Sequence, residues 1–288
     1  MVRGLVFFFN HVPRSLANFV GAAFGLTAWA VMAKDRLKIY RHLSLAYGDD
    51  LTDPQKRAIG RDFFINSGKN VADVIRLRKY FDSELKPLVT IEGLEYFDAA
   101  HKRGRGVFGV TGHIGNFELL AAYIQSIGYQ AAVIGRQAYD ERLDEIMVGN
   151  REALGLTNIS TTDHPRRIIE WLRQGNIIGV LIDTDSIRVR TMFVPAFGRL
   201  SNTPVGHALI ALRTKAALVP VACLRTEDNG YKIVFKPEIE ARPTGDEQRD
   251  IYEVTLKCNQ ALEEIITEYK DQWIWLHNRW HTRPEKSA

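Results

Sequence analysis

Cysteine is scarce in this chain, with Cys223 and Cys258 the only two among 288 residues. A disulfide framework needs more cysteines than this, and neither residue stands in a metal-ligand spacing. Both occupy apolar periodic positions, which is typical of buried thiols. The sequence therefore indicates a protein of a reducing compartment, and it argues against a small fold held together by disulfides.

A strong excess of one charge is also lacking. The chain has 38 lysines and arginines against 34 acidic residues, which gives a net charge of +4. Neither a dense basic stripe nor the signature of a nucleic-acid-binding module is present, so we predict no nucleic-acid partner. The mild basic excess suits an anionic partner, such as a lipid surface, an acidic protein or a phosphorylated substrate.

One apolar run stands out from an otherwise ordinary globular composition. Residues 16–33 carry no charge, and as a helix they would span roughly 27 Å, just short of the ~30 Å hydrocarbon thickness of a bilayer. Three interpretations stay open: a membrane anchor or interfacial helix, a buried core helix, and a cleaved signal peptide. Gly21 and Gly25 form a GxxxG pair, which could let another helix approach closely, although this spacing is often accidental in an Ala/Gly-rich helix.

Short apolar strands alternate with helices over the rest of the chain. The strands are expected at residues 88–92, 106–111, 130–135, 176–182, 217–224 and 231–236. The helices are expected at residues 36–47, 52–78, 94–103, 115–127, 140–154, 164–174, 203–215 and 247–269. This alternation predicts an α/β fold with a mostly parallel central sheet flanked by helices. Because no Pro/Gly-rich linker divides it, we predict a single domain over residues 35–288, preceded by a membrane anchor or interfacial helix in residues 1–34.

The segment richest in chemistry is RGVFGVTGHIGNFELLAA at residues 105–122. His113 lies in the turn after a buried strand, where active sites of open α/β sheets are found. Glu118 follows in the first turns of a helix, and could reach back to hold one ring nitrogen of the imidazole. The other nitrogen is then free to take a proton from a hydroxyl, and backbone N–H groups at the helix start could meet negative charge. The same H-x4-E spacing also arises by coincidence.

Further candidates stand at the ends of elements. Arg136 follows a strand and Arg151 ends a helix, so either could bind a phosphate bidentately, while Arg151 could equally be a solvated helix charge. Asp183 ends a strand, where it could order an arginine or cap the next turn. Trp273 and Trp275 suit either a membrane interface or a terminal segment packed on the core.

These motifs resemble a known family. VTGHIGNFELLA at residues 110–121 is similar to the H-x4-D/E motif of glycerolipid acyltransferases, and more closely to the late acyltransferases of lipid A biosynthesis. Four further segments resemble the same branch in the same order, so the resemblance covers nearly the whole chain. They are residues 133–151, LIDTD at 181–185, the loop, helix and Val-Pro strand at 192–221, and WIWLHNRWHTRP at 273–284.

The resemblance implies a mechanism of direct acyl transfer and a set of site residues. His113 would act as general base with Glu118 as its partner, and Arg136, Arg151 and Asp183 would belong to the substrate site. A hydroxyl would attack the thioester of an acyl carrier protein or coenzyme A co-substrate, with no acyl-enzyme, no metal and no further cofactor. Many members have Asp-Gln where this chain has Asp-Thr-Asp at residues 183–185, so the third residue has no role in the family pattern.

The implied acceptor is an anionic glycolipid, a lipid A precursor, at the cytoplasmic face of the inner membrane. Acyl carrier protein and the membrane would be the other partners. Alternative acceptors are a lysophospholipid, a glycosylated phosphoinositide or an aminolipid. A non-catalytic, membrane-peripheral lipid-binding protein is the alternative of a different class.

Overall fold

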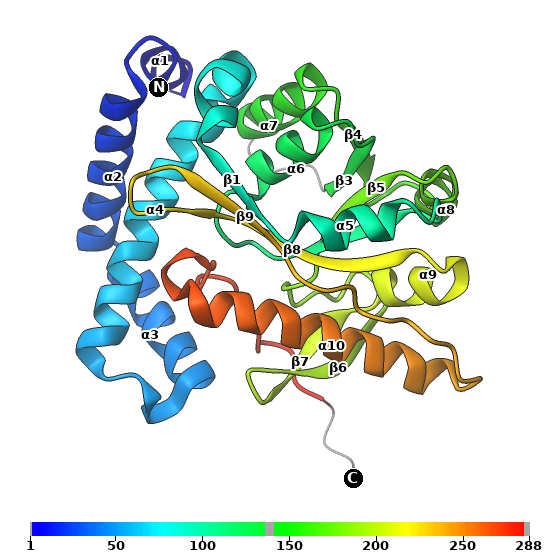
Figure 1. Ribbon diagram of the computed structural model, residues 1–288. Helices are drawn as coiled ribbons and strands as arrows, with labels where there is room; N and C mark the ends of the chain where they lie inside the picture. Colours follow the sequence, from blue (N-terminus) through cyan, green and yellow to red (C-terminus); the bar gives the residue numbers. More distant parts are fainter. Residues whose placement is uncertain (1, 136–140, 285–288) are drawn as a thin grey trace.

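A seven-stranded sheet forms the centre of the computed structural model, which describes residues 2–135 and 141–284 (Figure 1). The strands lie in the order β1-β9-β8-β2-β5-β3-β4. All neighbours are parallel except β8 and β9, so the predicted mostly parallel α/β sheet is confirmed. The bounds are β1 Val89–Glu92, β2 Val107–Thr111, β3 Ala131–Gly135, β4 Thr157–Ser160, β5 Ile177–Leu181, β8 Ala217–Arg225 and β9 Tyr231–Phe235.

Helices cover both faces of this sheet. The side chains of β2 and β8 alternate between two buried clusters: one includes side chains of α8, α9 and α10, and the other includes side chains of α5 and α6. The bounds are α5 Leu94–His101, α6 Phe117–Ser126, α7 Glu141–Ala153, α8 Pro165–Arg173, α9 Gly206–Thr214 and α10 Glu247–Glu268. This arrangement explains why β2 and β8 are continuous apolar runs, since both of their faces are buried.

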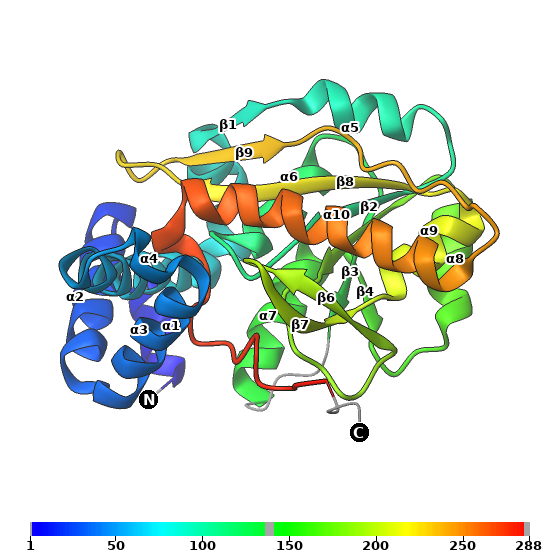
Figure 2. The same ribbon diagram turned by 90° about the horizontal axis from the view of Figure 1, so that it is seen from below.

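Two elements were not predicted as strands. β4 is a polar edge strand, TNIS, with a single fully buried residue, so it lacks the apolar run that marks the others. The second is a hairpin of β6 (Thr191–Ala196) and β7 (Arg199–Pro204), in the segment interpreted as a loop. Its two turn residues, Phe197 and Gly198, both have positive φ, as a two-residue hairpin turn requires. The hairpin lies beneath α10 in the view of Figure 2.

Four N-terminal helices gather on one side of the sheet: α1 (Val2–Phe9), α2 (Arg14–Val31), α3 (Ala33–Tyr47) and α4 (Asp53–Tyr80) (Figures 1 and 2). A capping box at Thr52 opens α4, with a proline in its first turn. Short 3₁₀ or π turns occupy Gly48–Asp50, Phe81–Leu85, Lys86–Leu88 and Lys270–Gln272.

Glycines hold α2 and α4 in close contact. A Cβ added at Gly25 would lie 2.1 Å from the carbonyl oxygen of Phe64, and one added at Gly21 would lie 2.5 Å from that of Gly68. Only glycine lets the two backbones approach this closely, so the expected close helix approach at the GxxxG pair is confirmed.

The outer face of α2 is apolar and exposed. Its inner face buries Ala17, Gly21, Gly25 and Trp29, so α2 is only half a core helix. Large apolar side chains on the rest of α2, each at least 40% exposed, are Leu16, Phe19, Phe24, Leu26 and Val31, and Met32 at the break and Leu37 of α3 are exposed as well. No single helix in the described part of the chain has the length and composition of a membrane span. One bent pair, Arg14–Val31 with Ala33–Asp50, meets that test with a bend of 88°.

Candidate active site

The site lies where two neighbouring parallel strands end at one edge of the sheet. β2 ends at Thr111 and β5 at Leu181, and these two residues are register partners. His113 and Asp183 each follow two residues later, so the register brings them together. Gly112 leaves room for this meeting, because a Cβ there would lie 2.8 Å from an oxygen of the Asp183 carboxylate.

Asp183 holds His113 at two points. Its Oδ1 lies 2.8 Å from His113 Nδ1, and its Oδ2 accepts the His113 backbone N–H at 2.7 Å. The indole N–H of Trp273 donates to the same Oδ2 at 2.8 Å. The Asp183 side chain is 2% exposed and that of His113 is 26% exposed. The carboxylate is thus buried beneath an imidazole that reaches the surface.

These donors keep the Asp183 carboxylate ionised. Burial alone would raise the pKa of Asp183, but the charge of His113, its two hydrogen bonds and that of Trp273 outweigh burial and hold the pKa well below its usual range. A carboxylate that accepts Nδ1–H fixes the tautomer in which Nε2 carries the lone pair. The pair can therefore take a proton at Nε2 and stabilise the imidazolium that results.

The predicted partner of His113 is a different carboxylate from the observed one. We expected Glu118 to hold a ring nitrogen, but both of its oxygens bind the Arg151 guanidinium, at 2.9 Å from Arg151 Nε and in a second contact with Nη2. The described residues show no hydrogen bond between His113 and Glu118. The first turn of α6 directs Glu118 toward α7 and β4 instead, where Arg151 also bonds Asn158 at 3.2 Å.

The outcome for the other predicted site residues follows from these contacts. Asp183 neither orders an arginine nor caps a turn, as we had proposed, and its buried carboxylate serves His113. Arg151 is not a solvated helix charge, because its side chain is 12% exposed and paired with Glu118. Arg136 lies outside the described residues. Asp185 bonds Asn202 at 3.0 Å and the backbone N–H of Thr282 at 2.6 Å, which anchors the C-terminal segment.

The turn after His113 is fastened to the backbone of β8. Gly115 has a φ of +58°, and a Cβ there would lie 2.0 Å from the carbonyl oxygen of Cys223, so only glycine fits. The Asn116 backbone N–H donates to that same oxygen at 2.8 Å, and its side chain caps α6 by accepting from Leu119 N–H at 3.0 Å. Asn70 of α4 donates to the Gly115 carbonyl at 3.0 Å. Contacts with β8 and with α4 therefore fix the position of the turn that follows His113.

The C-terminal segment forms one wall of the site. Trp273 and Trp275 are 2% and 0% exposed, which confirms that they pack on the core rather than face a membrane. Ile274 N–H donates to the His113 carbonyl at 3.0 Å. His277 brings its ring to 4.5 Å from the ring of His113. We had no prediction for His277 at the site, because nothing in its local sequence indicates which strand end it will reach.

His277 is neutral near pH 7. Burial, followed by the proximity of His113, lowers the pKa of His277 to about 4. The ligand atoms of His113, Asp183 and His277 all lie within 4.8 Å, which makes this a candidate metal group. However, Asp183 already accepts three N–H donors, so the geometry favours a base with its orienting carboxylate over a ligand set.

A narrow apolar cavity runs beside the pair. It has a volume of about 40 Å³, and lies between α6 and strands β2, β3 and β5. Phe117, whose ring is 5.4 Å from that of His113, stands at one part of its wall. Glu118, Arg151 and Thr111 contribute the polar part of the lining, and the remaining residues are apolar. The cavity is thus an apolar slot adjacent to a proton acceptor.

Comparisons with known proteins give the family of this chain. The family description "bacterial lipid A biosynthesis acyltransferase" matches residues 1–282. The chain is 23% identical to the lipid A biosynthesis palmitoleoyltransferase of Escherichia coli, over 98% of this chain and 90% of that one. It is 23% identical to the lauroyltransferase of the same organism, with the same coverage. A phosphatidylinositol mannoside acyltransferase of Mycobacterium tuberculosis is 24% identical over 66% of this chain and 59% of its own length.

The family match spans almost the whole chain, including the residues of the candidate site. The predicted family and the prediction of an enzyme are both confirmed. This chain belongs to the bacterial lipid A biosynthesis acyltransferase family, and it is an acyltransferase.

Proposed function

We propose that this acyltransferase moves a fatty acyl chain from an acyl thioester to a hydroxyl of a lipid A precursor, with His113 as general base. The observation that carries the proposal is the His113–Asp183 pair, with the carboxylate 2% exposed and the imidazole open to the site. The donor is an acyl carrier protein or coenzyme A thioester, and the acceptor is an anionic glycolipid at the cytoplasmic face of the inner membrane.

The reaction proceeds by direct attack. The acceptor hydroxyl oxygen attacks the thioester carbonyl carbon while His113 Nε2 takes the hydroxyl proton. Asp183 stabilises the imidazolium through Nδ1. The tetrahedral intermediate then expels the thiol sulfur, which receives the proton from His113, so the products are an ester and a free thiol. No acyl-enzyme and no metal are required. The helix start at α6, four residues after His113, offers N–H groups to the developing oxyanion.

Glu118 and Arg151 support the site from the side. Their ion pair ties α6 to α7, and Arg151 also reaches Asn158 of β4, so the pair sets the width of the apolar slot between them. We assign this slot to the acyl chain. Its volume of about 40 Å³ is close to the ~30 Å³ that one water occupies in the liquid, so α6 has to move outward when a chain enters. Arg136 stays a predicted substrate residue.

A second acceptor is supported by one comparison. Phosphatidylinositol mannoside acyltransferases match two thirds of this chain, and that part extends beyond any single motif. A glycosylated phosphoinositide is therefore the alternative acceptor, with the same base and the same donor chemistry.

Thiol release tests the activity directly. Purified protein in detergent is given an acyl-carrier-protein thioester with a lipid A precursor or a glycosylated phosphoinositide, and the lipid product is identified by mass spectrometry. We expect His113→Ala to lower turnover by about 10²- to 10⁴-fold. His164→Ala is the matched control, because His164 caps α8 and is expected to retain turnover. Equal turnover of the two variants would contradict the assignment of His113 as the base. If product forms only with the glycosylated phosphoinositide, that lipid and not the lipid A precursor is the acceptor.

A further inference from the structure

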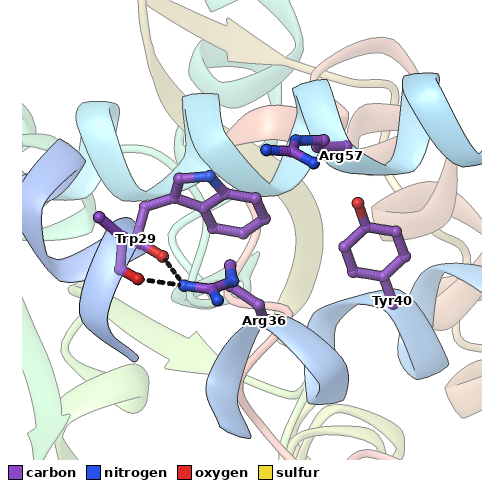
Figure 3. Close-up of a pocket in the computed structure, with 5 residues that line it drawn as sticks. Trp29, Arg36, Tyr40 and Arg57 are labelled. Carbon is purple, nitrogen blue, oxygen red and sulfur yellow. Dashed lines mark hydrogen bonds between the residues drawn. The ribbon is translucent and has the colours of Figure 1, made fainter. Parts of the chain in front are cut away.

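A second cavity lies far from the strand ends in sequence, at the break between α2 and α3. It has a volume of about 280 Å³ and is lined by Trp29, Ala30, Arg36, Tyr40 and Arg57. Figure 3 shows the two guanidinium groups on either side of the Trp29 indole, and the Tyr40 ring across from them with its hydroxyl directed toward α4. Small-molecule pockets hold roughly 300–1,000 Å³, so this cavity suits a headgroup rather than a whole lipid.

The charge in this cavity is not balanced. Arg36 Nη1 bonds the backbone carbonyls of Trp29 and, at 2.6 Å, Ala30, and its guanidinium lies 5.7 Å from the Trp29 ring. Arg57 is exposed on α4. Neither guanidinium has an ion pair with a carboxylate in residues 2–135 and 141–284. The lining of this cavity thus carries two guanidinium groups and a tyrosine hydroxyl but no carboxylate, which suits an anion, and guanidinium forks match a phosphate.

The surroundings show where that anion comes from. Val31, Met32 and Leu37 are 71%, 40% and 70% exposed, and they lie at the end of α2, at the break and near the start of α3, next to Arg36 in the chain. Phe24 and Leu26, 56% and 48% exposed, continue the apolar surface along α2. A phosphate bound in this cavity would thus lie beside side chains suited to the acyl region, as a phospholipid headgroup does at a bilayer surface.

We propose that the pocket of Trp29, Arg36, Tyr40 and Arg57 binds the phosphate of an anionic phospholipid and docks the α2–α3 corner on the membrane. This site is separate from the His113 centre and does not depend on the acyl transfer proposed above. A net positive charge attracts the protein to any anionic surface. This site selects a phospholipid, because two guanidinium groups hold its phosphate and its acyl chains contact the exposed face of α2.

The test measures co-sedimentation with vesicles of phosphatidylcholine with phosphatidylglycerol, and of phosphatidylcholine alone. We expect Arg57→Gln to weaken binding to the anionic vesicles about tenfold more than Arg61→Gln does. Arg61 is the matched control, since it lies one turn further along α4, pairs with Asp62 and does not line the cavity. Tyr40→Phe is expected to weaken binding less than Arg57→Gln. His113→Ala is expected to bind vesicles like the wild type, which separates docking from catalysis.

Two results would overturn the proposal. Equal losses for Arg57→Gln and Arg61→Gln would mean that a diffuse surface field, and not the pocket, holds the protein. A second experiment titrates the protein with inorganic phosphate by calorimetry, in the absence of vesicles. Binding of free phosphate that is tighter than binding of vesicles, and is abolished in Arg57→Gln, would assign the site to a soluble anion. The unfolding transition of Arg57→Gln is measured to verify that the variant is folded, so that a loss of binding is not the result of misfolding.

Discussion

At the scale of single residues, the imidazole of His113 is buried on its Nδ1 side and open on its Nε2 side. Asp183 and Trp273 form the buried side, and the backbone of Gly112 provides the space they need. Each contact is short and the carboxylate has no solvent around it, so the tautomer of His113 is determined by packing. The reactivity of one nitrogen therefore depends on a residue 70 positions away in the chain.

Replacing the carboxylate of Asp183 tests this dependence. Asp183→Asn preserves the shape but removes the charge that stabilises the imidazolium, so we expect turnover to fall by about 10²- to 10⁴-fold with little change in KM. Asp185→Asn is the control, since Asp185 contacts Asn202 and Thr282 and not His113. Equal turnover of Asp183→Asn and Asp185→Asn would contradict the role of Asp183.

The ion pair of Glu118 and Arg151 makes a different prediction. Their side chains are 6% and 12% exposed, so Glu118→Leu leaves a nearly buried cation and should lower the free energy of unfolding by about 3–5 kcal/mol. The double variant with Arg151→Met removes both charges and should regain most of that loss. We expect its turnover to stay above that of His113→Ala, measured by thiol release after denaturant titration has shown that it is folded. A stable double variant as inactive as His113→Ala would place the pair in the chemistry itself.

At the scale of elements, the contact between α2 and α4 depends on backbone proximity. The periodicity of residues 16–33 indicates a helix but not its neighbour, and it was the GxxxG pair that indicated a close approach. The structure adds Gly68 from α4 to that contact. Because the glycines come from both helices, a side chain on either one would push the helices apart.

Gly25→Ala tests this packing. The added methyl group would lie 2.1 Å from the Phe64 carbonyl oxygen, so α2 has to move, and we expect a loss of about 1–3 kcal/mol in the free energy of unfolding. Gly206→Ala is the control, because a Cβ there has no neighbour within 4 Å and alanine favours the start of α9. Denaturant unfolding in the same detergent compares the two. If Gly25→Ala is as stable as Gly206→Ala, the helices are not in close contact in solution.

At the scale of the whole molecule, buried charge joins the N-terminal helices to the sheet. Asp73 of α4 is 0% exposed, and it pairs with Arg14 of α2 at 2.8 Å and with Arg225 of β8 at 2.7 Å. Tyr231 of β9 donates its hydroxyl to the same carboxylate at 2.7 Å. The α2 helix, with its exposed apolar face, is therefore fastened to β8 and β9, and the apolar N-terminus is part of the folded structure.

Buried histidines make the stability of the whole chain sensitive to pH. His207 of α9 is 3% exposed, and burial lowers its pKa to about 4. Its pKa in the unfolded chain is about 6.5, so the unfolded state binds the proton first as pH falls. The stability that neutral His207 contributes is thus present above pH 6.5 and is lost between about pH 6.5 and 4.

His207→Leu should flatten this dependence. Between pH 7 and pH 5 we expect the wild type to lose about 2 kcal/mol more unfolding free energy than the variant, because leucine binds no proton in either state. Urea titrations at the two pH values measure the difference. His277, whose pKa is lowered in the same direction, remains in both proteins and contributes equally to each. Parallel losses in the two proteins would show that His207 is protonated in the folded state.

The sequence by itself determined the fold class, the six apolar strands and the family, and it predicted His113 as the base. Each of these depends on a pattern of neighbouring residues, such as an apolar run of strand length, a capped helix start or a histidine at a strand end. The edge strand β4 and the β6–β7 hairpin escaped prediction because their residues are polar or belong to a segment read as a loop. A pattern of neighbouring residues does not show which side chains are buried by residues far away in the sequence.

Only the tertiary structure decided which carboxylate serves His113. Glu118 is five residues away and Asp183 is 70, yet the register of β2 and β5 places the strand end nearer than the helix turn. The same holds for His277, which a C-terminal segment brings to the site, and for the pairing of Arg151 with Glu118. Parallel strands bring their carboxyl ends together whatever their separation in the chain, so contacts across the sheet edge follow from strand order, which the sequence pattern leaves open.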